Sequence, residues 1–403
     1  MNKKVVIIGG GIIGLCSAYY LQKAGHEVTV IDKSDFSSGA SHVNAGIITP
    51  SHIISLAAPG MINKGIKWMF SATSPLSIKP RLDLDFFKWS LLFKKASTQK
   101  KVQQSIPVIK DINLFSKELY ESIKASDDFD FFYQDKGLLM YYKTDKAGEE
   151  EWTVGKRAIK EDLKVENLTK EEVQKLEPNS NLDIKGAVYY HSDAHMTPNE
   201  FIPQLKSYLE KNGVTFLSNE EVQEINISNN KVASVTTNKQ TILADEYVLA
   251  TGSWTQDLAK KLQLNIPVQA GKGYRINVKK ETGITIPAIL MEAKVAVTPM
   301  NGFTRFAGTM EIGGINHKIN SARVKTIAKA GEQYYSGLKI SQQEIIEVKK
   351  RIMSKEENLE CSFCGRQKAE TNLLIAGIDA HICDKCIEQA GGILEEEVTE
   401  KQA

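Results

Sequence analysis

Cysteine is scarce through most of this 403-residue chain, because Cys16 is the only cysteine before residue 361 and the other four lie between residues 361 and 386. That distribution excludes a disulfide framework in the body of the protein and favours a reducing, cytoplasmic compartment. The chain contains no uninterrupted apolar run of 18 residues, so it predicts no membrane-spanning helix. A net charge of +2 is too small to indicate nucleic acid as a partner. Glycines interrupt the apolar stretch that ends at Leu15, and no cleavage site follows it, which argues against a secretory signal.

The length predicts two or three domains, and the pattern of residues changes along the chain. Residues 1–60 and 186–260 contain buried-strand patterns that run into glycine turns, so together they predict one discontinuous α/β domain. Residues 61–185 and 261–350 mix aromatic, charged and strand-like segments, which predicts an inserted α+β domain. The pattern changes abruptly at residues 351–353, and a third, small domain is expected over 353–403.

The clearest local pattern lies at the start of the chain, where the glycines Gly9-x-Gly11-x-x-Gly14 follow the apolar run Val5 to Ile8 and open an expected helix. A strand, a glycine turn and a helix in this order hold a pyrophosphate on backbone N–H groups. Asp32 ends the next expected strand, where a carboxylate can accept hydrogen bonds from ribose hydroxyls. The pattern therefore predicts dinucleotide binding; the alternative is a glycine-rich turn in an α/β domain that binds no nucleotide.

Residues 1 to about 345 resemble bacterial FAD-dependent D-amino acid dehydrogenases, within the wider glycine-oxidase-like family. The segments that carry the resemblance, besides Val5 to Asp32, are Gly39 to Gly46, Ala58 to Gly60 with Ile66 to Phe70, Ala250 to Ser253, and Gly271 to Tyr274. The resemblance implies a Rossmann-like FAD-binding domain with an inserted substrate domain, and non-covalent FAD. The cofactor residues expected from the glycine pattern and the resemblance are Gly9, Gly11, Ile12, Ile13, Gly14, Asp32, Lys33, Ser41, Asn44, Ala45, Gly46, Val222, Ala250, Thr251 and Gly252.

The resemblance also implies a reaction, in which hydride passes from the Cα of a small D-amino acid to the flavin and water then releases the keto acid. Because the flavin carries this chemistry, the protein must mainly bind the substrate carboxylate and orient the amine. The candidates for that role are Tyr274, Arg275 and Arg305, although an arginine on a strand is also commonly a solvated surface residue. His195 precedes an expected helix and is interpreted as its cap, and Glu292 as a partner of one arginine.

Two further segments bear on the expected activity and on contact with a membrane. Members of the family carry a Gly-Leu-Arg-Pro and a Pro-Asp-Gly-x-Pro motif near the end, but neither follows Lys350 here, so impaired activity is expected. The aromatic run from Phe86 to Lys95 predicts a core helix, with peripheral contact to a membrane surface as the alternative.

The cysteine pairs Cys361-x-x-Cys364 and Cys383-x-x-Cys386 are separated by eighteen residues. Two thiolate pairs at this spacing favour a closed tetrahedral zinc site, with a rubredoxin-type iron site and two disulfides as the alternatives. A unit of about 50 residues buries too small a core to fold alone, so the metal would supply most of its stability.

Residues 353 to about 397 resemble the N-terminal zinc-binding domain of ClpX, the ATPase subunit of the Clp protease. The resemblance rests on Cys361 to Gly365, Leu374 to Gly377 and Ile382 to Cys386, and it implies dimerisation and the docking of Clp adaptor or substrate proteins. No Gly-x-x-x-x-Gly-Lys-Ser/Thr loop occurs in the chain, so no ATPase activity is expected. The expected function is thus FAD-dependent oxidation of a D-amino acid, fused to a zinc-binding domain. The alternative is a non-catalytic fusion whose zinc domain binds Clp-system partners or unfolded protein.

Overall fold

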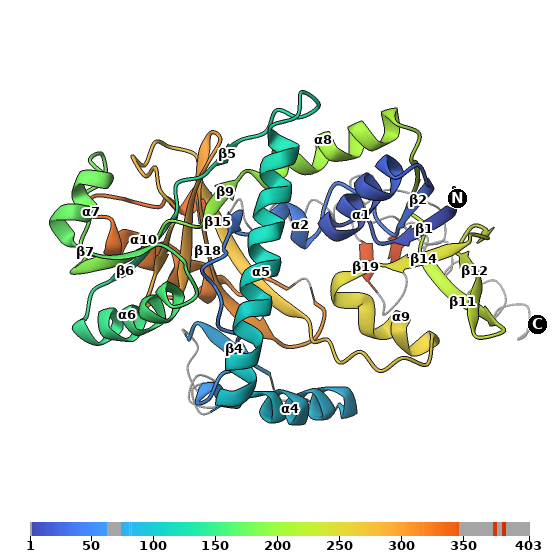
Figure 1. The fold of residues 1–403 in the computed structure, drawn as a ribbon, viewed down its shortest axis with the longest axis horizontal. Coiled ribbons are helices and arrows are strands. Elements are labelled where there is room, and N and C mark those ends of the chain that lie inside the picture. Colours follow the sequence, from blue (N-terminus) through green and yellow to red (C-terminus); the bar gives the residue numbers. More distant parts are fainter. Residues whose placement is uncertain are drawn as a thin grey trace, which may run out of the picture. The chain divides into compact units, whose positions relative to one another are not determined.

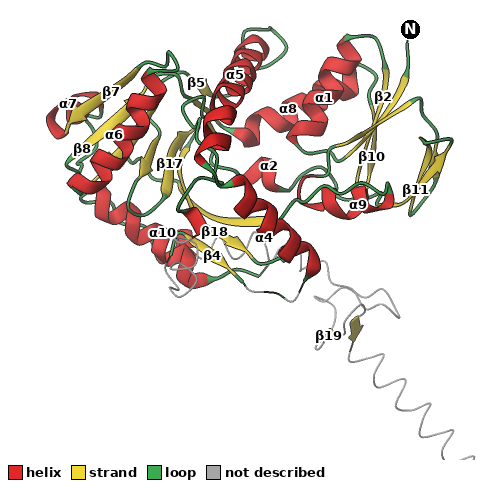
Figure 2. Cartoon of the chain, turned by 60° about the horizontal axis from the view of Figure 1, so that its bottom comes forward, coloured by secondary structure: helices red, strands yellow, loops and turns green. Residues whose placement is uncertain are grey.

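The computed structural model describes residues 2–62, 74–79, 81, 83–316, 318–345, 374–376 and 381–383 (Figures 1 and 2). Contacts divide the chain into two units, Met1–Ile340 and Ser341–Ala403. The motif segment 66–70 and the cysteines Cys361, Cys364 and Cys386 lie outside the described residues.

The first unit contains a four-stranded parallel sheet built from two distant parts of the chain. Its strands, in spatial order, are β10 (Thr215–Ser218), β2 (Glu27–Asp32), β1 (Lys4–Ile8) and β14 (Glu246–Leu249). The uninterrupted apolar run of β1 is typical of a strand that is buried on both faces. Helix α1 (Ile12–Lys23) connects β1 to β2, as the glycine pattern predicts.

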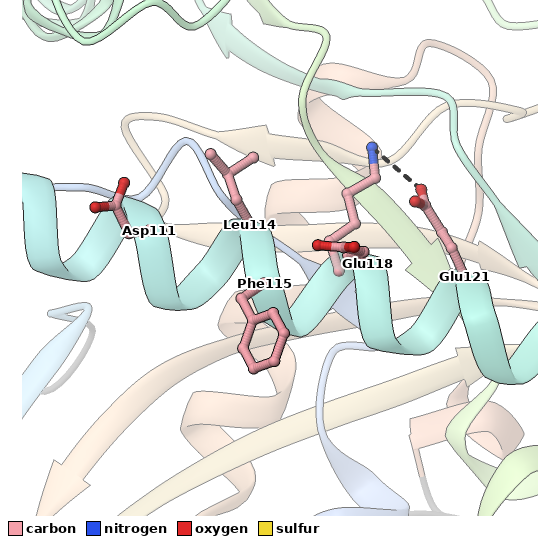
Figure 3. Close-up of a pocket in the computed structure, with 6 residues that line it drawn as sticks. Asp111, Leu114, Phe115, Glu118 and Glu121 are labelled. Atoms are coloured by element: carbon pink, nitrogen blue, oxygen red, sulfur yellow. Dashed lines mark ion pairs between the residues drawn. The ribbon is translucent and has the colours of Figure 1, made fainter.

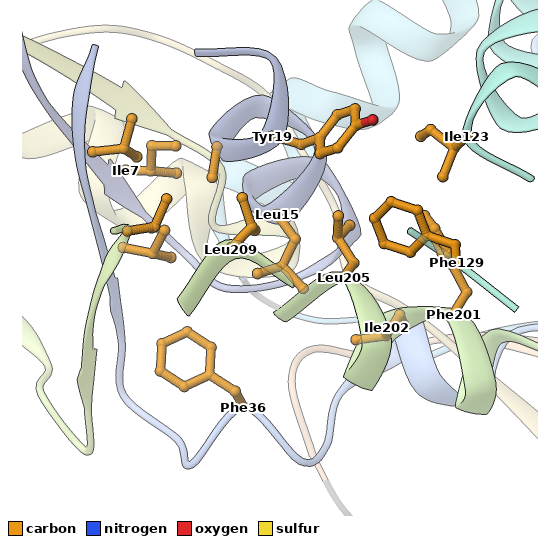
Figure 4. Packing of buried hydrophobic residues seen from close by; sticks show 14 of the residues in the cluster. Ile7, Leu15, Tyr19, Phe36, Ile123, Phe129, Phe201, Ile202, Leu205 and Leu209 are labelled. Carbon is orange, nitrogen blue, oxygen red and sulfur yellow. The ribbon is translucent and has the colours of Figure 1, made fainter. Parts of the chain in front are cut away.

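Both faces of this sheet are covered, and β1 contributes alternate residues to each side. Val5 and Ile7 join a core that includes the helices α1 and α8 (Pro198–Lys211), whose packing Figure 4 shows. Val6 and Ile8 join a second core with the antiparallel strands β11 (Val222–Ser228), β12 (Lys231–Thr237) and β13 (Thr241–Ile242). The parallel sheet therefore lies between two helices on one face and a small β-meander on the other. This packing on both faces fixes the positions of the loops at the ends of the parallel strands.

A larger, eight-stranded sheet forms the other part of the first unit. Its path is β15 (Gly271–Val278), β18 (Phe303–Ile312), β17 (Val295–Met300), β16 (Ala288–Leu290), β6 (Leu138–Tyr142), β8 (Gly186–Tyr190) and β7 (Val165–Thr169), and β4 (Leu76–Ile78) pairs with β18. Helix α10 (Ser321–Tyr334) packs on β15, β17 and β18, whereas α6 (Asp145–Ile159) packs on β6, β7 and β8 (Figure 2). The short helix α7 (Lys170–Leu176) follows β7.

Short elements complete the described residues. The short helix α2 (Ala40–Val43) precedes the strand β3 (Ile47–Ile48). This strand forms a three-stranded sheet with β9 (Ala194–Met196) and β5 (Tyr133–Gln134), in which β9 is the central strand. The turn η1 (Gly252–Trp254) and helix α9 (Thr255–Lys261) follow β14. In the second unit, β19 (Leu374–Ala376) and β20 (His381–Cys383) form an antiparallel pair.

Two consecutive helices, α4 (Leu84–Ala96) and α5 (Gln99–Lys124), differ in their burial, and α5 contributes Val102, Ile106 and Ile123 to the buried residues. The core helix predicted for residues 86–95 is wrong, because no residue of α4 is buried and Phe87 exposes 61% of its surface. Hydrophobic composition alone did not reveal that, among the described residues, few other elements pack on this helix. No helix among the described residues is long and apolar enough to cross a membrane.

Truncation of Phe201 to alanine should destabilise the first unit by about 3 to 5 kcal/mol, because the ring is fully buried and lies 4.7 Å from Phe131 and 5.5 Å from Tyr120 between ring centroids. Phe87→Ala, the matched control on α4, should change the free energy of unfolding by less than about 0.5 kcal/mol. Urea unfolding followed by far-ultraviolet circular dichroism measures both. Equal destabilisation by the two variants would contradict the packing described.

Candidate functional site

The turn between β1 and α1 depends on two glycines that leave no room for a side chain. Gly9 has φ +109°, and a Cβ there would lie 2.4 Å from the carbonyl oxygen of Ala250. A Cβ on Gly14 would lie 1.9 Å from the carbonyl oxygen of Gly9. The amide of Ala250 donates to the carbonyl of Ile8 at 2.8 Å, so the ends of β1 and β14 are held together at this turn.

Gly11, the middle glycine, is different because its surroundings are open. A Cβ there would meet only the Ser41 hydroxyl, at 3.2 Å, within a 4 Å radius. The same hydroxyl accepts a hydrogen bond from the amide of Ile12 at 2.9 Å, while the side chain of Ile13 is exposed. A pyrophosphate can therefore approach the backbone at the N-terminus of α1, where N–H groups and the helix dipole favour negative charge. These residues fit the phosphates of a dinucleotide.

Asp32 and Lys33 connect the end of β2 to this turn. One carboxylate oxygen of Asp32 accepts from the amide of Gly10 at 2.7 Å, and the other accepts from the amide and hydroxyl of Ser34 at 2.8 and 2.7 Å. The Lys33 ammonium lies 3.8 Å from the centroid of the Trp254 ring, just after Gly252. The ends of β2 and β14 thus flank the glycine turn, and Thr251 is the residue just before the short helix η1 that follows β14.

The loop from Ser41 to Gly46, whose first residues belong to the short helix α2, is fixed mainly by the side chain of Asn44. Its amide group donates to the carbonyl of Ser41 at 2.8 Å, and its carbonyl oxygen accepts from the amide of Gly46 at 2.7 Å across Ala45. Gly46 has φ +71°, and a Cβ there would lie 2.5 Å from the carbonyl oxygen of Met196. Only glycine fits there without displacing β9.

Asp193 anchors the chain just beyond this loop. It is fully buried and accepts hydrogen bonds from the amide and hydroxyl of Ser51 at 2.9 and 2.6 Å. Burial raises the pKa of Asp193 to about 6, against hydrogen bonds that lower it.

Strand alternation separates the three predicted substrate residues. Arg275 and Arg305 lie on one face of the large sheet, because Asn277, which is directly opposite Arg305 in the register, accepts hydrogen bonds from both side chains at 3.2 and 3.0 Å. The guanidinium of Arg305 also donates to the Asn44 carbonyl at 2.6 Å, so this face lies against the loop from Ser41 to Gly46. The sequence missed Asn277, although its position two residues after Arg275 on an expected strand places it on the same face.

Tyr274 lies on the opposite face of the sheet, because successive strand residues point in opposite directions. Its hydroxyl donates to Glu311 at 3.0 Å, and Glu311 lies 3.9 Å from the Arg323 guanidinium on α10. Burial, and then this hydrogen bond, raises the pKa of Tyr274 to about 12. The structure therefore brings Arg275 and Arg305 together but directs Tyr274 away from them.

Two interpretations of polar residues are corrected by the structure. His195 does not cap a helix: it lies in β9, is fully buried, and neither ring nitrogen has a hydrogen-bond partner among the described residues. Burial lowers its pKa to about 4. Glu292 does not pair with an arginine but accepts from the amides of Lys143 and Thr144, both at 3.0 Å, at the start of α6. Val222, the first residue of β11, belongs to the core on that side of the parallel sheet and is only 8% exposed.

A shallow hollow of about 450 Å³ lies along α5 (Figure 3). Its lining residues all come from this one helix, and they are Asp111, Leu114, Phe115, Lys117, Glu118 and Glu121. Lys117 is paired with Glu121 at 3.6 Å, so the acidic side chains outnumber the cation. Such a surface repels a carboxylate, so we do not assign the substrate carboxylate to it.

The expected metal centre lies almost entirely outside the described residues. Cys383 ends β20, where it is opposite Leu374 in the register, and Cys361, Cys364 and Cys386 are not described. Among the described residues, no three acidic, histidine or cysteine side chains are grouped to hold a metal. Cys16, near the glycine turn, is half-buried, and burial raises its pKa to about 12.

Comparison with known proteins assigns both parts of the chain. Residues 4–350 match the family described as FAD dependent oxidoreductase, and residues 359–396 match the ClpX C4-type zinc finger. The D-amino acid dehydrogenase of Helicobacter pylori is 31% identical over 331 residues, which cover 82% of this chain and 79% of that protein. The D-amino acid dehydrogenase of Vibrio vulnificus is 31% identical over 340 residues, covering 81% and 80%.

Solved structures support the same fold. Glycine oxidase from Bacillus cereus is similar with a TM-score of 0.60 and 20% identity, over 83% of this chain and 78% of that one. An L-alpha-glycerophosphate oxidase from Mycoplasma pneumoniae, solved with FAD bound, is similar with a TM-score of 0.59 and 20% identity, over 84% and 80%. The α/β fold expected from the glycine pattern and the resemblance is therefore confirmed.

Two glycine variants test the geometry of the turn. Gly11→Ala should fold normally, because Gly11 has extended backbone and open surroundings, but it should lose bound FAD as the methyl group occupies the approach to the backbone. Gly14→Ala should unfold the first unit, because its Cβ would lie 1.9 Å from the Gly9 oxygen. Circular dichroism and flavin absorbance after gel filtration measure the two effects. A Gly11→Ala protein that retains FAD would contradict the proposed approach.

Proposed function

Because the chain belongs to the family of FAD-dependent oxidoreductases, we propose that it oxidises the amine of a small D-amino acid to the imino acid, which water converts to the keto acid. The observation that carries the proposal is the polar face formed by Arg275, Asn277 and Arg305, which lies against the loop from Ser41 to Gly46. Identity of 31% to D-amino acid dehydrogenases supports the D-configuration.

FAD, which membership of the family implies, accepts the hydride from the substrate Cα when it is bound. The pyrophosphate of FAD would lie at Gly11 and Ile12, with Asp32 and Lys33 toward the adenosine and Ala250 to Gly252 on the other side of the turn. The loop from Ser41 to Gly46 would lie along the flavin. Backbone groups dominate this proposed set, and the packing of Gly9 and Gly14 holds them in position.

Arg275 is the residue that we expect to bind the substrate carboxylate. It is half-buried and shares a face with Arg305, so its cation faces the same side as the loop beside the flavin. A charge-assisted hydrogen bond from a guanidinium to a carboxylate is strong and directional, and it would orient the Cα–H bond for hydride transfer. We do not assign Tyr274 to the substrate, because it lies on the α10 side of the sheet.

For the second unit, the proposal is one zinc ion held by Cys361, Cys364, Cys383 and Cys386. The match to the ClpX C4-type zinc finger over residues 359–396 supports it, as does the antiparallel pair β19 and β20, which ends at one of the four cysteines. Self-association through this unit follows from the same resemblance. The second candidate function, docking of Clp-system proteins by the zinc unit without catalysis, rests on this match alone.

The proposed substrate class is tested by anaerobic mixing of the FAD-loaded protein with D-alanine or D-proline. Either should bleach the flavin absorbance, and the L-enantiomers should not. Arg275→Met should raise the substrate concentration for half-maximal bleaching by about 10- to 100-fold, because a hydrogen-bonded charge contact is worth about 1.5 to 3 kcal/mol. Arg157→Met, on helix α6, is the matched control and should change nothing. Bleaching by L-amino acids alone would overturn the substrate class.

Metal analysis of the full chain tests the zinc site. We expect one zinc ion per chain, loss of the metal in Cys383→Ser, and full metal content in Cys16→Ser, since Cys16 lies in the first unit. A chelator strong enough to remove zinc should also unfold the second unit, because the metal contributes most of its stability. Iron in place of zinc, or equal loss in both variants, would contradict the assignment.

A further inference from the structure

Arg305 is the largest fully buried side chain among the described residues. Its three guanidinium nitrogens donate to three segments that are distant in the sequence: Nε to Asn277 Oδ1 at 3.0 Å, Nη1 to the Asn44 carbonyl oxygen at 2.6 Å, and Nη2 to Asn199 Oδ1 at 3.1 Å. The guanidinium carbon also lies 5.3 Å from the centroid of the Phe303 ring. One side chain on β18 thus joins β15, the loop after α2, and the start of α8.

Burying a guanidinium costs free energy unless its N–H groups are hydrogen-bonded. Moving any of the three acceptors away would therefore leave a buried N–H group without a partner, so the three acceptors are held in place. The acceptor that matters most is Asn44. Its side chain already fixes the loop by bonding to Ser41 and Gly46, and its backbone carbonyl now ties that loop to the large sheet. The loop can therefore move relative to β18 only if the short Nη1 hydrogen bond breaks.

We propose that Arg305 is a positioning residue: it fixes the loop from Ser41 to Gly46 on the large sheet, and it does not touch the substrate. The inference rests on the proposed function only in that this loop is taken to lie along FAD. Exposure separates the two arginines of this face. Arg305 has no solvent-accessible surface, whereas Arg275 is half-buried, so of these two side chains only that of Arg275 is partly open to solvent.

The position of the cation gives it an electrostatic role as well. A charge in a solvent-excluded region acts more strongly than one in water. With FAD against the loop, the Arg305 charge would favour the reduced flavin, which carries more negative charge than the oxidised form. Removing the charge should lower the midpoint potential of the bound flavin, an effect that simple loss of packing would not produce.

The test compares Arg305→Lys, which keeps the charge but cannot make three divergent hydrogen bonds, with Arg275→Lys as the matched control. Amide hydrogen exchange is measured in the FAD-free protein for residues 44–48 and, as an internal reference, for the β11–β12 hairpin. Arg305→Lys should speed exchange of residues 44–48 by about tenfold and weaken FAD binding by about tenfold, because one charged hydrogen bond is lost at the loop. Arg275→Lys should alter neither.

Steady-state kinetics and a potential measurement complete the test. Arg305→Lys should leave KM for the D-amino acid within about twofold, while Arg275→Lys raises KM. Arg305→Gln should lower the flavin midpoint potential relative to Arg305→Lys. The proposal is overturned if Arg305→Lys raises KM but leaves both the amide hydrogen exchange of residues 44–48 and the FAD affinity unchanged. Arg305 would then be a substrate contact. If D-amino acids are not oxidised at all but exchange and FAD affinity change as expected, the proposed function fails and the positioning role stands.

Discussion

The close approach of the β1–α1 turn to the end of β14 is the constraint on which the rest of the first unit depends. A methyl group at Gly14 would overlap the carbonyl oxygen of Gly9, and one at Gly9 would overlap that of Ala250. With those side chains absent, α1 starts directly above β1 and the sheet stays closed between β1 and β14. The N–H groups at the start of α1 are then presented to a ligand from a rigid base, which is the arrangement that binds a pyrophosphate.

A second constraint is the alternation of side chains along β15 and β18. One face of these strands carries polar residues that reach the loop after α2, and the other packs on α10 with a buried Tyr274 and Glu311. This division gives adjacent residues unrelated roles: Arg275 faces the loop side and Tyr274 the helix side. On the first face two cations, Arg275 and Arg305, lie close together, whereas on the second face the cation Arg323 lies 3.9 Å from the carboxylate of Glu311.

The two units of the chain reach stability by different means. The first has extensive buried cores on both sides of its parallel sheet, so it needs no metal to fold. The second is short and matches a four-cysteine zinc finger, a class in which metal coordination replaces the missing core. Because the residues that we propose for FAD and for zinc are different, the proposed oxidoreductase and docking functions can be tested independently on one chain.

The local pattern determined a good part of this protein. The apolar run of β1, the glycine spacing and Asp32 predicted the strand, the turn and the carboxylate beside it, because each depends on neighbours within about 30 residues. The cysteine spacing predicted the zinc finger for the same reason. Tertiary structure alone decided the rest. The exposure of α4, the burial of His195 and the contacts of Arg305 with Asn44 and Asn199 all depend on which distant segments pack together, and no short-range pattern encodes that. The sequence indicates Arg305 as a cation, but only the fold shows that it is buried and hydrogen-bonded to a loop 261 residues away.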